Sequence, residues 1–275
     1  YQDLSLAHPR AMVYDLGWRK LFLNTMHKKL LLKEIGIPLF NSRDTLRRLA
    51  NDFAIDPSPL EKYITYLPVA VESYQHDSGE RERIRRKYGI EGDEKVIIAI
   101  SNFNKIKRPE RIQSLIMAYA QQPASQKVKW LLVGGGRTAG PIDEIAKDVR
   151  VARMCVRIGE IPHDDVYKFY SAADVAVSTS ERESFGYFIA EGMAGGLPFV
   201  AYRGGAIEEI IENGKTGYVV ENERDFLACL KTIIEDPARA KRMGEAGKYK
   251  IKNTYAEAIF KERFVKIINE EFQIP

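Results

Sequence analysis

The sequence predicts an α/β protein whose main domain is built on a doubly wound parallel sheet. The chain has 275 residues, 45% of them hydrophobic and 29% charged, which is enough for one large core and part of another. After Gly92, short apolar segments alternate regularly with helical patterns. Several of these segments lack polar alternation, as is typical of parallel strands that helices cover on both faces.

The first 71 residues form a zone of their own. In chain order we expect a strand at 4–8, a helix at 18–34, a strand at 37–40, a helix at 44–51 and an extended segment at 63–67. Asn41 and Ser42 supply capping groups for the second helix. Pro68 then breaks the pattern, and a polar stretch leads into a charged helix at 81–88. We therefore place a domain boundary near residues 68 to 75.

Six strands are expected beyond this boundary, at 96–100, 128–133, 156–158, 175–178, 198–201 and 218–220. Helices are expected between them at 109–120, 141–149, 164–172, 185–194 and 206–212, and the tail from 225 to 272 is helical by its periodicity. In such open sheets ligands bind outside the carboxyl ends of the strands. The chemistry is therefore expected in the loops that follow the strands.

Composition and charge narrow the class of protein. The longest purely apolar runs fall far short of the roughly 20 residues that a membrane-spanning helix needs. Cys155 and Cys229 lie in apolar segments, so a disulfide framework is not expected and a reducing cytoplasm is the expected compartment. The stretch from Arg10 to Arg48 holds nine basic and three acidic residues. This stretch is either a solvated helix face or a surface attracted to an anionic membrane or polyanionic substrate, without the interleaved aromatics typical of nucleic-acid binding.

Two glycine motifs favour turns over cofactor sites, and the metal-ligating residue types do not form a metal site. The loop Gly134 to Gly140 follows a strand, but Ala139 stands where a dinucleotide fingerprint needs its third glycine, which favours a turn cluster. Gly214-Lys215-Thr216 fails as a phosphate-binding loop because Glu209 occupies the position of the first glycine. The chain contains no Asp-x-Asp pair and no Cys/His cluster, so we expect no metal held by the protein.

The most informative segment runs from Ser180 to Pro198, directly after a predicted strand. Ser184 is placed to cap a helix whose first amides, from Phe185, Gly186 and Tyr187, would face the cleft as an anion site. Glycine at 186 would let a phosphate approach the backbone closely. Singly, Glu183 and Glu191 are most simply solvated helix residues. Together they bracket the helix end and suit a nucleoside-diphosphate sugar, with a ribose at one end and a hexose at the other.

This segment closely resembles the Glu-x7-Glu motif of retaining glycosyltransferases with two Rossmann-like domains, the GT-B fold of family 4 (glycosyl transferases group 1). Glu183 and Glu191 match its two carboxylates, and Glu183-Ser184-Phe185-Gly186 matches the usual family sequence. The resemblance implies that Glu183 lies near the donor sugar and Glu191 binds the nucleotide ribose. It also implies that the amides of Ser184, Phe185 and Gly186 contact the sugar and phosphate.

Three further segments carry the same resemblance. Residues 100–109 are similar to the family's Gly-Arg-(x4)-Lys loop, which grips the donor diphosphate. Lys107 matches the lysine, but Asn102 stands where arginine is usual, with Lys105 or Arg108 as candidate replacements. Ile158 and Gly159 lie in a segment that resembles the loop meeting the nucleobase, and residues 66–71 resemble the interdomain segment.

The resemblance also implies the domain organisation. Residues 1–71 would be the remnant of an acceptor-side Rossmann-like domain, 72–255 the donor-binding domain, and 256–275 a helix that packs back on the first. Most of the amino-terminal domain would then be missing from the chain. His8 falls roughly where the family places an active-site histidine, although a capping or exposed histidine is an equally open interpretation.

The resulting hypothesis is a retaining hexosyltransferase that uses a UDP- or GDP-sugar and needs no metal or cofactor. Its acceptor would be a hydroxyl of a glycan, a lipid-linked molecule or a small molecule, with peripheral contact to an anionic membrane. Glu183, Lys107 and His8 would be catalytic, and the departing phosphate would assist a front-face displacement. Two alternatives stay open: a non-catalytic nucleotide-sugar-binding or partner module, suggested by Asn102, and an NAD-dependent oxidoreductase or epimerase, suggested by the glycine loop.

Overall fold

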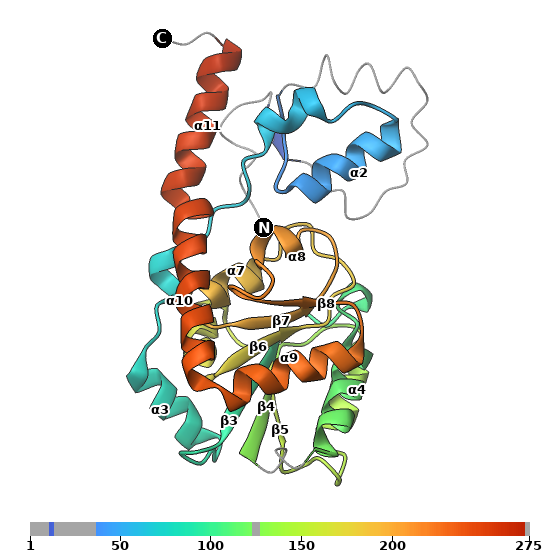
Figure 1. The fold of residues 1–275 in the computed structure, drawn as a ribbon, viewed down its shortest axis with the longest axis vertical. Coiled ribbons are helices and arrows are strands. Elements are labelled where there is room, and N and C mark those ends of the chain that lie inside the picture. The colour runs from blue at the N-terminus through green and yellow to red at the C-terminus, as the bar shows by residue number, and fades with distance from the viewer. Residues whose placement is uncertain (1–10, 14–36, 123–126, 273–275) are drawn as a thin grey trace. The chain divides into compact units, whose positions relative to one another are not determined.

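The computed structural model describes residues 11–13, 37–122 and 127–272 (Figure 1). The chain divides into two compact units, one joining Tyr1–Pro68 to Tyr255–Pro275 and the other comprising Val69–Thr254. The predicted strand at 4–8, the predicted helix at 18–34, His8 and most of the basic stretch lie outside the described residues.

A six-stranded parallel sheet forms the centre of the Val69–Thr254 unit. Its strands are β3 (Lys95–Ile100), β4 (Val128–Val133), β5 (Cys155–Gly159), β6 (Val175–Ser178), β7 (Phe199–Tyr202) and β8 (Gly217–Val220). They lie in the order β5-β4-β3-β6-β7-β8, so all six predicted strands and the predicted doubly wound sheet are confirmed. The direction of winding reverses between β3 and β6. This switch point is where ligands bind in open α/β sheets.

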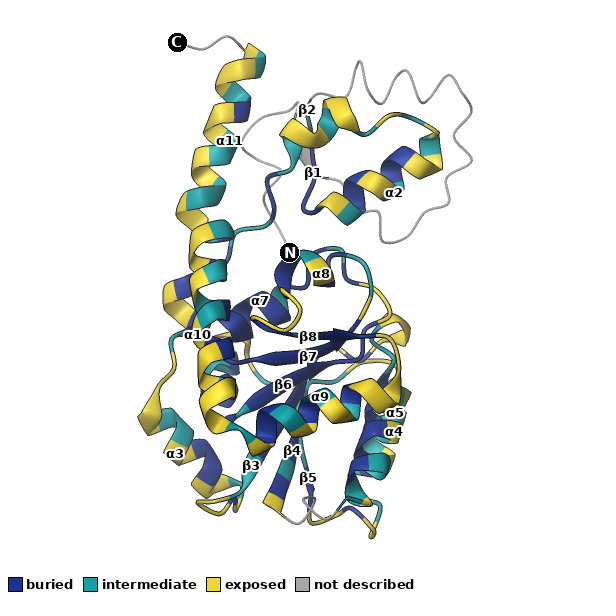
Figure 2. Cartoon of the chain, in the orientation of Figure 1, coloured by how far each residue is buried: buried dark blue, intermediate teal, exposed yellow. Residues whose placement is uncertain are grey.

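Helices cover the two faces of this sheet. Neighbouring helices α4 (Pro109–Ala120), α5 (Gly140–Ile145) and α9 (Glu223–Glu235) form one layer. Helices α3 (Ser78–Lys87), α6 (Val166–Ala172), α7 (Tyr187–Ala194) and α10 (Pro237–Thr254) form the other. Figure 2 shows most strand residues between them as buried, which explains why their sequences are mostly apolar.

Several helix boundaries differ from the prediction. The helix expected at 141–149 ends at Ile145, and the one expected at 206–212 is the single turn α8 (Ile207–Ile210). The tail is three helices, because Pro237 cannot extend α9 and instead begins α10, while α11 (Glu257–Phe272) follows a break at Tyr255.

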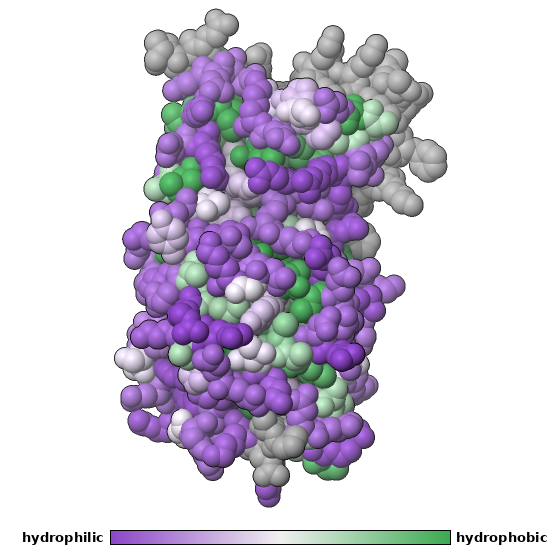
Figure 3. Space-filling model, in the orientation of Figure 1, coloured by the Kyte–Doolittle hydropathy of each residue, from purple (hydrophilic) through white to green (hydrophobic). Residues whose placement is uncertain are grey.

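On the face in Figure 3 the surface is mostly hydrophilic.

The smaller unit contains the predicted strand at 37–40 and the predicted helix at 44–51. β2 (Ile37–Leu39) pairs in parallel with β1 (Ala11–Val13), a strand that the sequence analysis did not expect. Ser42 caps α2 (Arg43–Phe53) as predicted, with its side chain accepting a hydrogen bond from the Thr45 amide at 3.1 Å. Within this unit, Ile267 of α11 packs against Ile37 and Leu39. The segment expected at 63–67 makes only an isolated bridge from Ile64 to Phe40, after the 3-10 helix Ser58–Tyr63.

Candidate active site at the carboxyl edge of the sheet

The loops that follow β3 and β6 meet at the switch point of the sheet. The Glu181 amide donates to the Ile106 carbonyl at 2.8 Å, and the Thr179 hydroxyl donates to the Lys107 carbonyl at 2.8 Å. Residues from both strand ends, together with Lys107 and Phe188, line a small crevice there. Two segments that the sequence analysis singled out separately are therefore in direct contact.

Lys107 and Glu183 form a mostly buried ion pair in this contact. The side chain of Asn104 accepts hydrogen bonds from the Ile106 and Lys107 amides and so fixes a 3-10 turn that ends at Lys107. Lys107 Nζ lies 2.5 Å from Glu183 Oε1, and the two side chains are only 19% and 8% exposed. The ammonium also lies 5.1 Å from the centre of the Phe188 ring. A cation thus stands beside the first carboxylate of the motif, largely shielded from solvent.

The start of α7 differs from the prediction. Ser184 does not cap this helix: Gly186, with φ of +91°, precedes its first residue, Tyr187, and no side chain caps the amino end. Glu183 is held in a β-bridge to Gly205, the chain bends at Ser184 and Phe185, and the helix therefore begins only after Gly186. Phe185 is buried in this turn. The amino end of the helix nevertheless follows shortly after Glu183 in the chain, and its dipole favours an anion there.

The second carboxylate of the motif is buried and held by a tyrosine. Glu191 Oε1 accepts a hydrogen bond from the Tyr74 hydroxyl at 2.9 Å, and His163 Nε2 lies 2.9 Å from the same hydroxyl and 3.5 Å from Oε1. Burial raises the pKa of Glu191, while the hydrogen bond from Tyr74 and the charge of His163 lower it. Among the described residues no hydrogen bond reaches Oε2, so one carboxylate oxygen can accept from a ligand.

Sequence reasoning missed Tyr74 and His163. Tyr74 ends the 3-10 helix Val71–Tyr74, within a stretch that was interpreted only as polar. His163 begins the 3-10 helix His163–Asp165, at the start of the helix expected at 164–172, and no side chain caps α6. The one signal that the sequence offers is an aromatic residue, Tyr74, in a polar stretch. This signal does not indicate which residue Tyr74 contacts.

The glycine loop supports the β3 loop by close backbone packing. Phe103 N donates to the Gly135 carbonyl at 2.6 Å. A Cβ at Gly134 would lie 1.9 Å from the Ser101 carbonyl oxygen, and one at Gly136 would lie 2.3 Å from the Phe103 carbonyl oxygen. Both glycines also have positive φ, of +108° and +130°. This close packing explains why glycine is required at these two positions, in agreement with the interpretation of the loop as a turn cluster.

The other predicted ligand residues surround this loop. Asn102 is exposed, and its Oδ1 would lie 2.6 Å from a Cβ at Gly136. Arg108 already forms ion pairs with Glu110 and Glu181, the latter at 3.1 Å, which weakens it as the replacement for the family's arginine. Lys105 is exposed in the turn that leads to Lys107.

The predicted nucleobase segment is part of the same edge. Ile158 and Gly159 end β5, and Gly159 has φ of +84°. The Gly159 carbonyl accepts from the Gly134 amide at 2.7 Å, which ties this segment to the glycine loop. Ile158 is half-buried, so part of it remains accessible at this edge.

Neither a metal cluster nor a membrane-spanning helix is found in the described part of the chain. Residues 11–13, 37–122 and 127–272 contain no group of three or more His, Cys, Asp or Glu that could hold a metal ion. Within the same ranges, no helix has the length and apolar character required to cross a bilayer.

Comparison with known proteins identifies relatives of the larger unit. Residues 80–250 match the family model described as "Glycosyl transferases group 1". The chain is 35% identical over 139 residues to N-acetyl-alpha-D-glucosaminyl L-malate synthase of Bacillus anthracis, covering 50% of this chain and 35% of that protein. It is 28% identical over 247 residues to the GDP-mannose-dependent alpha-(1-6)-phosphatidylinositol monomannoside mannosyltransferase of Mycolicibacterium smegmatis, covering 86% of this chain and 63% of that protein.

Solved structures show the same fold. The sucrose-phosphate synthase of Thermosynechococcus elongatus superposes with a TM-score of 0.75 at 21% identity, covering 90% of this chain and 61% of the other. HepE from Anabaena, solved in complex with UDP, superposes with a TM-score of 0.78 at 17% identity, covering 90% and 69%. The predicted fold class, a Rossmann-like domain of the GT-B type, is therefore confirmed. The chain spans less than two thirds of the length of the two curated relatives above.

Proposed function

The chain belongs to the glycosyl transferases group 1 family, and from this premise we propose that it is the donor-binding part of a retaining glycosyltransferase. The enzyme would move a hexose from a nucleoside-diphosphate sugar to an acceptor hydroxyl without a metal. The observation that carries the proposal is the Lys107–Glu183 ion pair, set before the amino end of α7 at the switch point of the sheet.

Lys107 and the helix end would stabilise the leaving diphosphate. As the bond between the anomeric carbon and the diphosphate breaks, negative charge grows on the departing oxygen. A lysine that is 19% exposed interacts with such charge more strongly than a fully solvated one. The uncapped amino end of α7 adds partial positive charge from its first amides, with Ser184, Phe185 and Gly186 lining the approach.

Glu183 would orient the sugar and Glu191 the ribose. Diphosphate binding would draw Lys107 away from Glu183, which leaves that carboxylate beside the developing positive charge of the sugar. Glu191 would accept a ribose hydroxyl through Oε2, while the nucleobase lies against Ile158 and Gly159 and Asn102 donates to a phosphate oxygen. His8, which lies outside the described residues, stays a prediction as the catalytic residue of the acceptor-side domain.

Retention would follow from attack on the face that the diphosphate leaves. The acceptor oxygen bonds to the anomeric carbon as the bond to the diphosphate breaks, and the acceptor proton passes to the departing phosphate oxygen. Neither carboxylate is then required as a covalent nucleophile.

The domain assignment is part of the proposal. Residues 72–255 would bind the donor, residues 1–71 would be the remnant of the acceptor-side domain, and 256–275 would pack back on that remnant. The contacts of Ile267 with Ile37 and Leu39 support the last point. Donor candidates are UDP- and GDP-sugars, because one relative was solved with UDP and another is named as GDP-mannose-dependent. The acceptor would be a glycan, a lipid-linked molecule or a small molecule, and cytoplasmic location with peripheral contact to an anionic membrane stays a prediction.

A panel of nucleotide sugars tests the proposal on the intact protein, with donor hydrolysis and transfer as readouts. We expect Lys107→Ala to lower turnover on the active donor by about 100-fold or more, because it removes a charge that acts on the transition state. Lys129→Ala is the matched control, since this lysine is 18% exposed and pairs with Glu94 at 3.3 Å. Normal turnover in Lys107→Ala, or an equal loss in the control, would contradict the donor-phosphate role.

One observation favours the non-catalytic alternative. Asn102 supplies no charge where the family has arginine, and Arg108 is occupied by Glu110 and Glu181. If the protein is a binding module, it will bind a nucleoside diphosphate sugar without hydrolysing or transferring it. A thermal-shift panel that includes NAD separates both cases from a dinucleotide enzyme, which only NAD would stabilise.

A further inference from the structure

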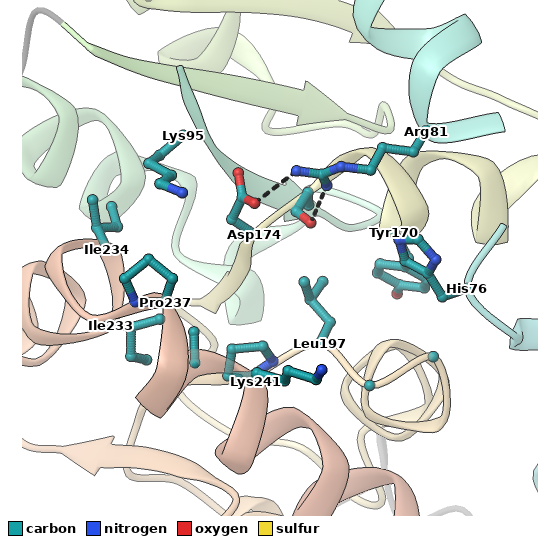
Figure 4. Close-up of a pocket in the computed structure, with 15 residues that line it drawn as sticks. His76, Arg81, Lys95, Tyr170, Asp174, Leu197, Ile233, Ile234, Pro237 and Lys241 are labelled. Atoms are coloured by element: carbon teal, nitrogen blue, oxygen red, sulfur yellow. Dashed lines mark hydrogen bonds and ion pairs between the residues drawn. The ribbon is translucent and has the colours of Figure 1, made fainter. Parts of the chain in front are cut away.

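A second pocket lies at the opposite edge of the sheet from the proposed donor site. It has a volume of about 270 Å³ and is lined by residues at the amino ends of β3 and β6, by the segment before β7, and by the junction of α9 with α10 (Figure 4). Lys107, Glu183 and Glu191 lie at the carboxyl edge and do not line it. No role in donor binding accounts for this pocket.

The charged groups of the pocket are unbalanced toward positive. Its lining includes Arg81, Lys95 and Lys241, together with His76, while Asp174 is the one carboxylate among the described lining residues. Asp174 is already occupied, because it accepts from the Arg81 guanidinium at 2.8 Å and from the Val96 amide at 2.8 Å. Arg81 is occupied as well, since it also donates to the Ser171, Ala172 and Ala173 carbonyls at 3.0 to 3.1 Å.

Lys95 and Lys241 are the cations left over. Neither forms an ion pair with a carboxylate of the described residues, whereas Lys129 on the neighbouring strand β4 pairs with Glu94. Figure 4 shows the two lysines on separate elements, Lys95 from β3 and Lys241 from α10, around the same hollow. Two ammonium groups that share a concave site raise the local positive potential and attract an anion.

The rest of the lining is apolar. Leu197, Pro198, Ile233, Ile234 and the ring of Tyr170 border the pocket. Most of these side chains are buried, so they form a fixed wall. A pocket with a few polar groups on an apolar wall is typical of a small-molecule site, and this volume lies just below the range of about 300 to 1,000 Å³ that is usual for such sites. The occupant must therefore be small, with one anionic group and C–H groups that can pack on the apolar wall.

We propose that this pocket binds a small phosphomonoester of about the size of a hexose phosphate. Its phosphate interacts with the ammonium groups of Lys95 and Lys241, which act as point charges toward phosphate oxygens. Its body lies on the apolar wall formed by Leu197, Ile233 and Ile234. The fixed Arg81–Asp174 pair closes one side without contributing net charge.

The test is a calorimetric titration of the intact protein with glucose 6-phosphate at pH 7, with and without a saturating nucleoside diphosphate. We expect saturable binding with a dissociation constant of about 1 mM or lower, which corresponds to about 4 kcal/mol. Lys95→Gln and Lys241→Gln should each weaken it about tenfold. Lys231→Gln is the matched control, because this exposed lysine of α9 lies outside the pocket, and it should leave the affinity unchanged.

The outcomes separate this site from the donor site. Binding that persists in Lys107→Ala supports the second site, and it does so even if the proposed transferase activity is absent. Loss of binding in Lys107→Ala, equal weakening in Lys231→Gln, or no saturation below about 10 mM would overturn the proposal. Equal affinity for free glucose or for inorganic phosphate would also overturn it, because the pocket then does not recognise a phosphomonoester. Thermal unfolding of each variant shows that it is folded.

Discussion

Replacing Tyr74 with phenylalanine removes the hydroxyl that donates to Glu191 Oε1 at 2.9 Å. The rest of the ring stays, so packing changes little. Burial raises the pKa of Glu191 in the folded protein, and the hydrogen bond from Tyr74 opposes that rise. The substitution should therefore raise the pKa of Glu191 further.

The sign and size follow from this shift. A carboxyl group whose pKa is raised in the folded protein costs no stability at pH values below its pKa in the unfolded chain. As the pH rises from that value through the folded pKa, the group lowers the free energy of unfolding. A hydrogen bond to a charged group contributes about 1.5 to 3 kcal/mol, and one between neutral groups about 0.5 to 1.5 kcal/mol. We expect Tyr74→Phe to lower the free energy of unfolding by about 1.5 to 3 kcal/mol at pH 8. Near pH 5, where more of the carboxyl is protonated, the loss should be closer to about 1 kcal/mol.

Denaturant unfolding from pH 5 to pH 8 measures this difference. Tyr170→Phe is the matched control, because it removes a buried hydroxyl that donates to the Phe188 carbonyl at 2.7 Å, a neutral acceptor. Its cost should be about 1 kcal/mol and nearly independent of pH in this range. In a Glu191→Gln background, the pH dependence of Tyr74→Phe should vanish.

A pH-independent cost of Tyr74→Phe would refute the reasoning, as would a cost that grows toward low pH. Pronounced pH dependence in the Glu191→Gln background would assign the effect to another group. The neighbouring groups that must then be considered are His163, Asp164 and Tyr187, which all act electrostatically on this cluster.

Two further substitutions probe the β3 loop. Gly134→Ala should lower the free energy of unfolding by about 3 kcal/mol or more, since its Cβ would lie 1.9 Å from the Ser101 carbonyl oxygen at a φ of +108°. Gly92→Ala, with nothing within 4 Å of its Cβ, should cost little in the same denaturation assay, and similar losses in both would contradict the packing role. Asn102→Arg should raise the calorimetric affinity for a nucleoside diphosphate about two- to fivefold, as expected for one exposed ion pair, and high salt should remove the gain. Unchanged affinity would show that residue 102 does not face the diphosphate.

The sheet was predictable because its signal is local. Residues 96–100 are apolar on both faces, as are residues 130–133, and the structure buries both faces between helices. The predicted start of α7 is wrong because the true start depends on a contact between residues that are distant in the sequence. Serine at 184 is a good local cap, but Glu183 forms a β-bridge with the distant Gly205 and the chain bends at Ser184 and Phe185, so the helix begins only at Tyr187.

The candidate site was only partly predictable. Glu183 and Lys107 were singled out by their motifs, but no sequence pattern links two residues that are 76 positions apart as one ion pair. The contact between Tyr74 and Glu191 spans 117 positions, and the single hydroxyl in a polar stretch carries no periodic signal. Such contacts depend on tertiary packing of loops, which local propensities do not encode.

The two carboxylates of the motif occupy different electrostatic environments, and this difference bears on their roles. Glu183 is balanced by a full charge on Lys107, so the pair is neutral before a donor arrives and its ions separate only if an anion competes for the lysine. Glu191 instead accepts from the neutral hydroxyl of Tyr74, with His163 Nε2 3.5 Å from the same oxygen, and among the described residues no lysine or arginine pairs with it. Under the proposed function, the first carboxylate would respond to the diphosphate and the second would hold a neutral ribose hydroxyl in place. Environments that set two carboxyl groups apart in this way mark different tasks in one site.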